Sequence, residues 1–201
     1  MFITFEGIDC CGKSTQAKLL YQYLKSIGEK VLLTQEPGGT NISNQIRSIV
    51  LSPKDKNIEM CKEAEFLLYS AARAQHSHQI IKNNLKSIII SDRYYDSSTV
   101  YQGIGRGIPK RIIKLINDFA TFKIVPDITF LIDIDVNKSL KRLDKKDMDR
   151  IENESMLFHQ KIREGFLNLA KKEPHRIIVK DGNQKVKNIH QQIIKDVKKL
   201  I

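Results

Sequence analysis

The feature that most constrains this chain is a phosphate-binding loop near its N-terminus. The pattern G-x-x-x-x-G-K-[ST] is completed by Gly7, Gly12, Lys13 and Ser14. It follows an apolar run at 2–6 and precedes a segment with helical spacing. In such a loop, backbone N–H groups face phosphate oxygens, the lysine neutralises the β- and γ-phosphates, and the serine hydroxyl is available to Mg²⁺. The pattern therefore predicts a P-loop fold that binds a nucleoside triphosphate.

Apolar runs rich in β-branched residues recur along the chain. They are continuous, as in strands buried on both faces of a parallel sheet, and they occupy 2–6, 30–35, 87–92, 128–134 and 175–181. Segments with helical spacing separate them, at 16–27, 61–85, 110–122, 154–171 and 185–200. This alternation predicts a three-layer α/β fold with a parallel sheet of about five strands flanked by helices. With no linker or repeat, 1–201 is expected to form a single domain.

Composition narrows the function classes. Three cysteines without C-x-x-C spacing predict no structural metal site and a reducing, cytoplasmic setting. His76 and His78 are two residues apart in an apparent helix and point in different directions, so they do not suit one metal ion. No apolar run approaches the roughly 18 residues of a membrane helix, so no membrane partner is expected. The net charge of +11 comes mostly from lysines spread along the chain. Without an aromatic-rich RNA motif, this charge predicts affinity for small anions and not for nucleic acid.

Later segments narrow the class of P-loop protein. A GTPase requires N-K-x-D, and the nearest match, NKSL at 137–140, has Leu140 in place of the aspartate. The predicted strand at 87–92 ends in Asp92, a carboxylate suited to Mg²⁺, and Arg93 follows it. A cation beside the metal ligand favours transfer to an anionic acceptor over transfer to water.

Two more arginines lie in otherwise apolar helical segments, Arg47 in NQIRSIVL and Arg73 in LLYSAAR. Because a buried arginine is costly unless paired, one interpretation is an internal ion pair with an acidic residue such as Glu36. The other is that both arginines converge with Arg93 on a second phosphate. A nucleoside monophosphate is largely ionised at pH 7, so phosphoryl transfer to it needs no general base, only positive charge that holds two anions together.

Six segments, taken together, resemble the bacterial thymidylate kinase family. In chain order they are FEGIDCCGKST, EPGGT, LLYSAAR, DRYYDSSTVYQG, PDITFLID and DRIE. The resemblance implies phosphorylation of dTMP to dTDP with MgATP, as a step of de novo and salvage dTTP synthesis. It also implies a homodimer of P-loop kinase domains, each with a short lid at 141–150.

The resemblance further implies roles for individual residues. Those expected to bind dTMP are Asp9, Glu36, Pro37, Arg47, Tyr69, Arg73, Arg93, Ser98, Tyr101 and Gln102. Those expected to bind ATP are Gly7, Ile8, Asp9, Cys10, Cys11, Gly12, Lys13, Ser14, Thr15 and Arg142, with the turn after Lys180 beside adenine. Those expected to order Mg²⁺ are Ser14, Asp92 and Glu36. Tyr69 would stack on thymine beside Arg73, which shares its helical face; a tyrosine packed in the core is the alternative.

The catalytic charge is where the chain departs from the family pattern. Members carry a catalytic arginine either directly after the position of Asp9 or in the lid, and Cys10 occupies the first place. The charged segment 141–150 fits either a solvated loop or a mobile lid. We predict that it acts as the lid and that Arg150, assisted by Lys145 and Lys146, neutralises the transition state. The predicted catalytic set is Lys13, Arg93, Lys146 and Arg150.

Other expectations concern the loop thiols and the rival functions. At the start of a helix, Cys10 and Cys11 are expected to have lowered pKa values, so that alkylation inactivates the protein and MgATP protects it. Two enzymatic rivals stay open, a kinase for another monophosphate such as dUMP and a deoxynucleoside kinase of similar fold. A P-loop regulatory or nucleic-acid-binding module is a third, supported only by the basic composition.

Overall fold

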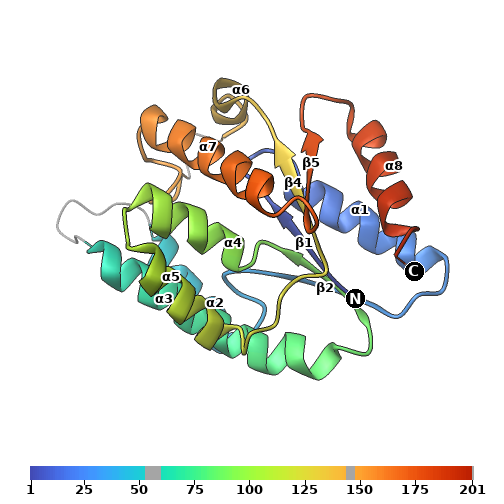
Figure 1. Ribbon diagram of the computed structural model, residues 1–201, viewed down its shortest axis with the longest axis horizontal. Helices are drawn as coiled ribbons and strands as arrows, with labels where there is room; N and C mark the ends of the chain where they lie inside the picture. Colours follow the sequence, from blue (N-terminus) through green and yellow to red (C-terminus); the bar gives the residue numbers. More distant parts are fainter. Residues whose placement is uncertain (53–59, 144–147, 201) are drawn as a thin grey trace.

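The computed structural model describes residues 1–52, 60–143 and 148–200. Its centre is a five-stranded parallel sheet with the strand order β2-β3-β1-β4-β5 (Figure 1). The strands are β1 (Phe2–Glu6), β2 (Val31–Gln35), β3 (Ile88–Asp92), β4 (Ile128–Asp133) and β5 (Ile177–Asp181). Each strand lies inside its predicted apolar run, and the predicted fold class is confirmed.

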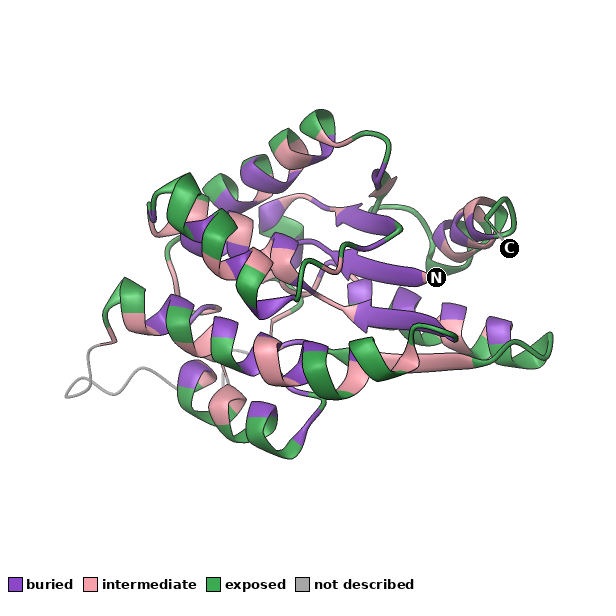
Figure 2. Cartoon of the chain, turned by 60° about the horizontal axis from the view of Figure 1, so that its bottom comes forward, coloured by how far each residue is buried: buried purple, intermediate pink, exposed green. Residues whose placement is uncertain are grey.

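Helices cover the sheet. The α-helices are α1 (Lys13–Ser26), α2 (Asn41–Leu51), α3 (Lys62–His76), α4 (Tyr95–Ser98), α5 (Lys110–Ala120), α6 (Val136–Leu140), α7 (Met156–Lys172) and α8 (Val186–Val197). α1 packs against α8 (Figure 1). α3 packs against α2, α4 and α5, and α7 packs against the π-helical segment Thr99–Gly105. The central strands are buried between helices whose outer sides are exposed (Figure 2). Among the described helices, none is long and apolar enough to cross a membrane.

β1 occupies the middle of the sheet, and this position explains why three of its five residues are large and apolar. Phe2 is in register with Ile89 of β3, and Ile3 is in register with Ile128 of β4. All of β1 is buried. Because parallel strands end at the same edge, the segments that follow β1, β2 and β3 meet there. The P-loop, the EPGG segment and Arg93 are therefore brought together by topology.

The predicted helix 61–85 is the clearest difference from expectation. α3 ends at His76, and a π-helical turn (Ser77–Ile81) and a 3₁₀ turn (Lys82–Asn84) follow it. Backbone dihedrals stay in the right-handed helical region through these junctions. The apolar spacing therefore continues while the hydrogen-bond pattern changes, and spacing alone does not reveal the change.

Candidate active site

The phosphate loop connects β1 to α1 and lies directly on β4. Gly7 has a φ of +142°, and a Cβ at this position would come within 2.6 Å of the Ile132 carbonyl oxygen. Only glycine fits this close approach. The Lys13 ammonium is buried and lies 3.3 Å from the Ile8 carbonyl and 3.5 Å from an Asp9 carboxylate oxygen. The loop thus holds its cation at the start of α1, where backbone N–H groups are free to bind anions.

The Asp9 carboxylate connects the phosphate loop to the segment after β3. It accepts hydrogen bonds from Arg93 Nη2 and from the Tyr101 hydroxyl, the latter at 3.2 Å. Burial favours the neutral acid, but the charges of Arg93 and Lys13 outweigh it and hold the pKa of Asp9 well below its usual range. Arg93 is therefore fixed at the junction between loop and sheet by a permanently ionised partner.

Two adjacent cavities share this junction. The first has a volume of about 90 Å³, and all ten residues predicted to bind dTMP line it. The second has a volume of about 550 Å³ and extends along the phosphate loop. It is lined by Asp9, Arg142 and every residue from Cys10 to Thr15. Four residues line both cavities and are among those predicted for dTMP: Asp9, Glu36, Arg47 and Arg93.

Some predictions for the second cavity differ from the structure. Gly7 and Ile8 do not line it, because Gly7 is pressed against β4. The turn after Lys180 does contribute, through Gly182 and Gln184. Residues that sequence reasoning missed are Leu51, Ser97, Asp149 and Ile151 in the first cavity and Gln16, Gln35, Ile132, Glu152, Val186 and Ile189 in the second. The sequence did contain a signal for four of them, because the DRYYDSSTVYQG and DRIE segments include Ser97, Asp149, Ile151 and Glu152.

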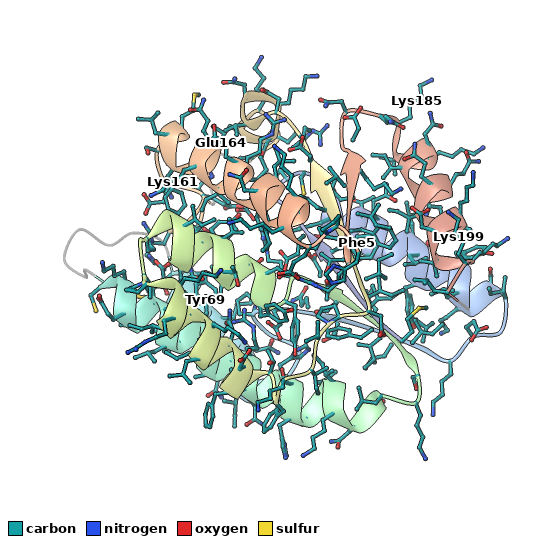
Figure 3. The ribbon with its side chains drawn as sticks, viewed as in Figure 1. Phe5, Tyr69, Lys161, Glu164, Lys185 and Lys199 are labelled. Carbon is teal, nitrogen blue, oxygen red and sulfur yellow. The ribbon has the colours of Figure 1, made fainter. Side chains whose placement is uncertain are left out.

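Arg73 fulfils both interpretations offered for it. Its Nε donates to Glu36 Oε2 at 2.8 Å, which is the internal ion pair, and it also lines the first cavity. His76 Nδ1 lies 2.9 Å from the other oxygen of the Glu36 carboxylate. Arg47 is not paired in this way, since its Nη1 donates to the Pro37 carbonyl at 2.8 Å. Tyr69, which is labelled in Figure 3, lines the first cavity from α3, and burial raises the pKa of its hydroxyl.

Comparison with known proteins agrees with this geometry. The family model described as thymidylate kinase matches residues 5–193. The chain belongs to the thymidylate kinase family. A thymidylate kinase of a Sulfurihydrogenibium species is 49% identical over 199 residues, covering 98% of this chain and 96% of the relative. One from a Thermoanaerobacter species is 43% identical over 202 residues, covering 100% and 98%. The crystal structure of thymidylate kinase from Ehrlichia chaffeensis superposes with a TM-score of 0.79 at 36% identity, covering 98% of each chain.

The second cavity of this thymidylate kinase family member offers suitable ligands for Mg²⁺. Asp92 Oδ1 is buried without a hydrogen-bond partner in the described chain, and Ser14 and Glu36 line the same cavity. The described residues contain no group of three or more His, Cys, Asp or Glu side chains that could hold a metal ion. That arrangement suits Mg²⁺, which keeps several waters and binds phosphate oxygens alongside one or two carboxylates.

The predicted lid cations lie apart from the phosphate loop or outside the described residues. Arg150 Nη1 donates to Glu65 Oε2 at 2.6 Å, and its Nε and Nη2 donate to the Val50 carbonyl. Arg150 lines neither of the two cavities. Lys145 and Lys146 are outside the described residues. Arg142 does reach the loop, where it donates to the Cys10 carbonyl at 3.1 Å.

The expectation of lowered thiol pKa values is wrong. Burial raises the pKa of both Cys10 and Cys11, and the nearby Asp9 carboxylate raises that of Cys10 further. Lys13 acts in the opposite direction but does not outweigh burial. A helix N-terminus lowers the pKa of a nearby thiol, but loss of solvent around the sulfur atoms raises it, and here the loss of solvent has the larger effect.

Proposed function

We propose that this chain is a thymidylate kinase that transfers the γ-phosphoryl group of ATP to dTMP, giving dTDP and ADP. One observation carries the proposal: the ten residues predicted for dTMP surround a single cavity that adjoins the phosphate loop. Membership of the family supports the same reaction. An oxygen of the dTMP phosphate attacks the γ-phosphorus while the bond to the bridging oxygen of ADP breaks.

The residues around the junction supply positioning and charge. Lys13 binds the phosphates of ATP, and Arg93 binds the dTMP phosphate from the shared wall of the two cavities. Ser14, Asp92 and Glu36 would hold Mg²⁺, which when bound neutralises the β- and γ-phosphate oxygens. Tyr69 and Arg73 bind the thymine base, and Asp9 binds the sugar 3′-hydroxyl. The whole chain acts as one kinase domain in the cytoplasm.

The transition-state cation is assigned to Arg150, with help from Lys146. In the structure Arg150 is paired with Glu65, so this role requires that its guanidinium leave the ion pair during the reaction. Single-turnover rates of Arg150→Ala test the assignment. A fall of more than about tenfold, or 1.4 kcal/mol, with unchanged ATP affinity is expected. A smaller fall rejects the role and leaves Arg150 as a structural partner of Glu65.

A homodimer formed through α3 and α5 is part of the proposal. These helices pack on each other, and they expose large apolar side chains at Leu67, Leu115 and Phe119, the last 82% exposed. Such side chains are typical of a surface that is covered by a partner. Sedimentation velocity should show a dimer for the wild type and a monomer for Phe119→Asp. A monomeric wild type would contradict this part of the proposal.

The substrate panel tests the reaction itself. ADP release is measured with dTMP, dUMP, dCMP, AMP and thymidine as acceptors at equal concentrations. The highest kcat/KM is expected for dTMP. Faster turnover of another monophosphate, or of thymidine, would overturn the choice of acceptor.

A further inference from the structure

A carboxylate that no proposed step uses lies behind the first cavity. Glu65 is in the first turn of α3, and its side chain is 1% exposed. It is four residues before Tyr69 and eight before Arg73, so the three occupy one side of the helix. Gln102, from the helical segment Thr99–Gly105, donates its Nε2 to Glu65 Oε1 at 2.8 Å. Gln102 lines the first cavity, whereas Glu65 does not.

The ionised state of Glu65 is well supported. Burial favours the neutral acid, but hydrogen bonds from Gln102, Arg106 and Arg150 outweigh it and lower the pKa of Glu65. Arg106 Nε lies 3.2 Å and 3.1 Å from the two carboxylate oxygens, and Arg150 Nη1 lies 2.6 Å from Oε2. Glu65 is therefore a carboxylate, a group that accepts hydrogen bonds and donates none.

The carboxylate decides which end of the Gln102 amide faces it. An amide has a donor nitrogen and an acceptor oxygen that are nearly equal in size, so packing alone does not distinguish its two orientations. Next to Glu65, only the NH₂ group makes a favourable contact. The amide oxygen must then point away from Glu65, and within the described chain it accepts no hydrogen bond. Arg73 donates four of its five N–H groups to Glu36, Ser98, Asn117 and the Tyr94 carbonyl, which leaves one Nη2 N–H without an acceptor in the described chain. The cavity wall thus presents an acceptor from Gln102 and this remaining donor of Arg73.

We propose that Glu65 is a positioning residue for base recognition, which fixes the Gln102 carbonyl as an acceptor for the ring N–H of a thymine or uracil base. Cytosine has an acceptor at that ring nitrogen, and it has an amino group where thymine has a carbonyl. It therefore opposes both the Gln102 oxygen and the remaining Nη2 donor of Arg73. A site that forms hydrogen bonds with the donors and acceptors of thymine rejects a base with the opposite arrangement strongly, because the buried polar groups of the protein are then left without partners. This inference rests on the proposed function, since it concerns the base of the acceptor.

Glu65→Gln is the decisive variant. Its amide can donate as well as accept, so Gln102 is free to turn its NH₂ group toward the base. We expect the ratio of kcat/KM for dTMP over dCMP to fall at least about tenfold. The ratio for dTMP over dUMP should stay within about twofold, because both bases carry the same ring N–H. A role in folding alone would lower all three values in proportion and leave both ratios unchanged.

Two further variants make the test specific. Glu154→Gln is the matched control, since Glu154 pairs with Arg106 Nη1 at 2.8 Å but makes no contact with Gln102. It should leave both ratios unchanged. Gln102→Leu should lower the dTMP-to-dCMP ratio as Glu65→Gln does, and combining the two changes should add nothing further. If thermal denaturation shows that Glu65→Gln does not fold, Glu65→Asp takes its place, because it keeps the charge but withdraws the oxygen from Gln102.

The outcomes separate this inference from the proposed function. A wild type without dTMP turnover would defeat the proposed function. A wild type that prefers dTMP, together with folded Glu65 variants whose dTMP-to-dCMP ratio is unchanged, would overturn only the inference. An equal fall in Glu154→Gln would also overturn it, because the effect would then come from the charge cluster and not from Gln102.

Discussion

Replacing Arg93 by lysine tests how the acceptor phosphate is held. The Arg93 Nη1 donates to the Gly7 carbonyl at 3.0 Å and to Ser97 Oγ at 3.1 Å, and Nη2 donates to Asp9. Within the described chain, these bonds leave the Nε–H and one Nη2 N–H without acceptors. The two remaining donors form one edge of the planar guanidinium, which matches a phosphate in a bidentate contact.

A lysine at this position keeps the positive charge but lacks the planar pair of N–H donors that makes the bidentate contact. Its ammonium can satisfy Asp9 and the neighbouring oxygens only by giving up at least one contact to phosphate. One charge-assisted hydrogen bond contributes about 1.5–3 kcal/mol. Arg93→Lys should therefore lower kcat/KM for dTMP about 10- to 150-fold. The KM for ATP should change little, because Lys13 and the loop backbone are untouched.

Coupled ADP-release kinetics at varied dTMP and saturating MgATP measure this loss. Arg163→Lys is the matched control, since Arg163 forms its ion pair with Asp133 and lines neither of the two cavities. Thermal denaturation establishes that both variants fold. A kcat/KM for Arg93→Lys within about threefold of the wild type would refute the bidentate contact, because that difference is below 1 kcal/mol.

Three further predictions concern titration, reactivity and metal. Burial raises the pKa of Glu6 from 4.5 to about 7, so the folded state holds the Glu6 proton more tightly than the unfolded state does. As the pH rises from 4.5 to 7, the free energy of unfolding of the wild type should therefore fall by about 3 kcal/mol relative to that of Glu6→Gln. Denaturant titrations at several pH values measure this difference. Equal pH profiles would contradict this. At pH 7, mass spectrometry should find alkylation of the exposed Cys61 before Cys10, whose pKa is raised; faster reaction at Cys10 would refute it. Asp92→Asn removes a negative charge beside the phosphates and a ligand for Mg²⁺. Calorimetry should therefore show tighter ATP binding in EDTA, and kinetics should show a weaker dependence of turnover on Mg²⁺. If both values are unchanged, Asp92 is not part of the metal site.

Fold and site were most predictable from the sequence where the residues that form them are close together along the chain. β1 and the loop after it form one continuous signal, because the buried strand is rich in large apolar residues and the loop needs glycine at Gly7. The first cavity was predictable for a related reason. Most of its residues come from short segments that follow β1, β2 and β3 or lie on one face of α3, so motif order already implies proximity once the sheet is parallel. Arg47 and Leu51 come from α2, and Asp149 and Ile151 precede α7.

Contacts between distant helices were not predictable in this way. Glu65 is 37 residues from Gln102 and 85 from Arg150, and no periodicity relates these positions. In the sequence Glu65 looks like an ordinary acidic residue in the first turn of a helix, and Arg150 looks like a free cation in a charged loop. Only packing reveals that they share a buried ion pair. The thiol expectation failed for a similar reason, since Cys11 is buried in the main hydrophobic core, which residues from distant parts of the chain complete.

The charge around the phosphate cavity clarifies what draws a nucleotide to this protein. The described wall of the second cavity holds four cations (Lys13, Arg47, Arg93 and Arg142) and five carboxylates (Asp9, Glu36, Asp92, Asp149 and Glu152). The net charge of +11 is therefore located elsewhere on the chain. Glu36 is also paired with Arg73, so the side chains around this cavity are close to charge balance. A divalent cation beside Asp92 would add positive charge where the triphosphate binds. The carboxylates would therefore favour the magnesium complex of ATP over ATP alone, while Lys13 and the arginines hold and orient the phosphates.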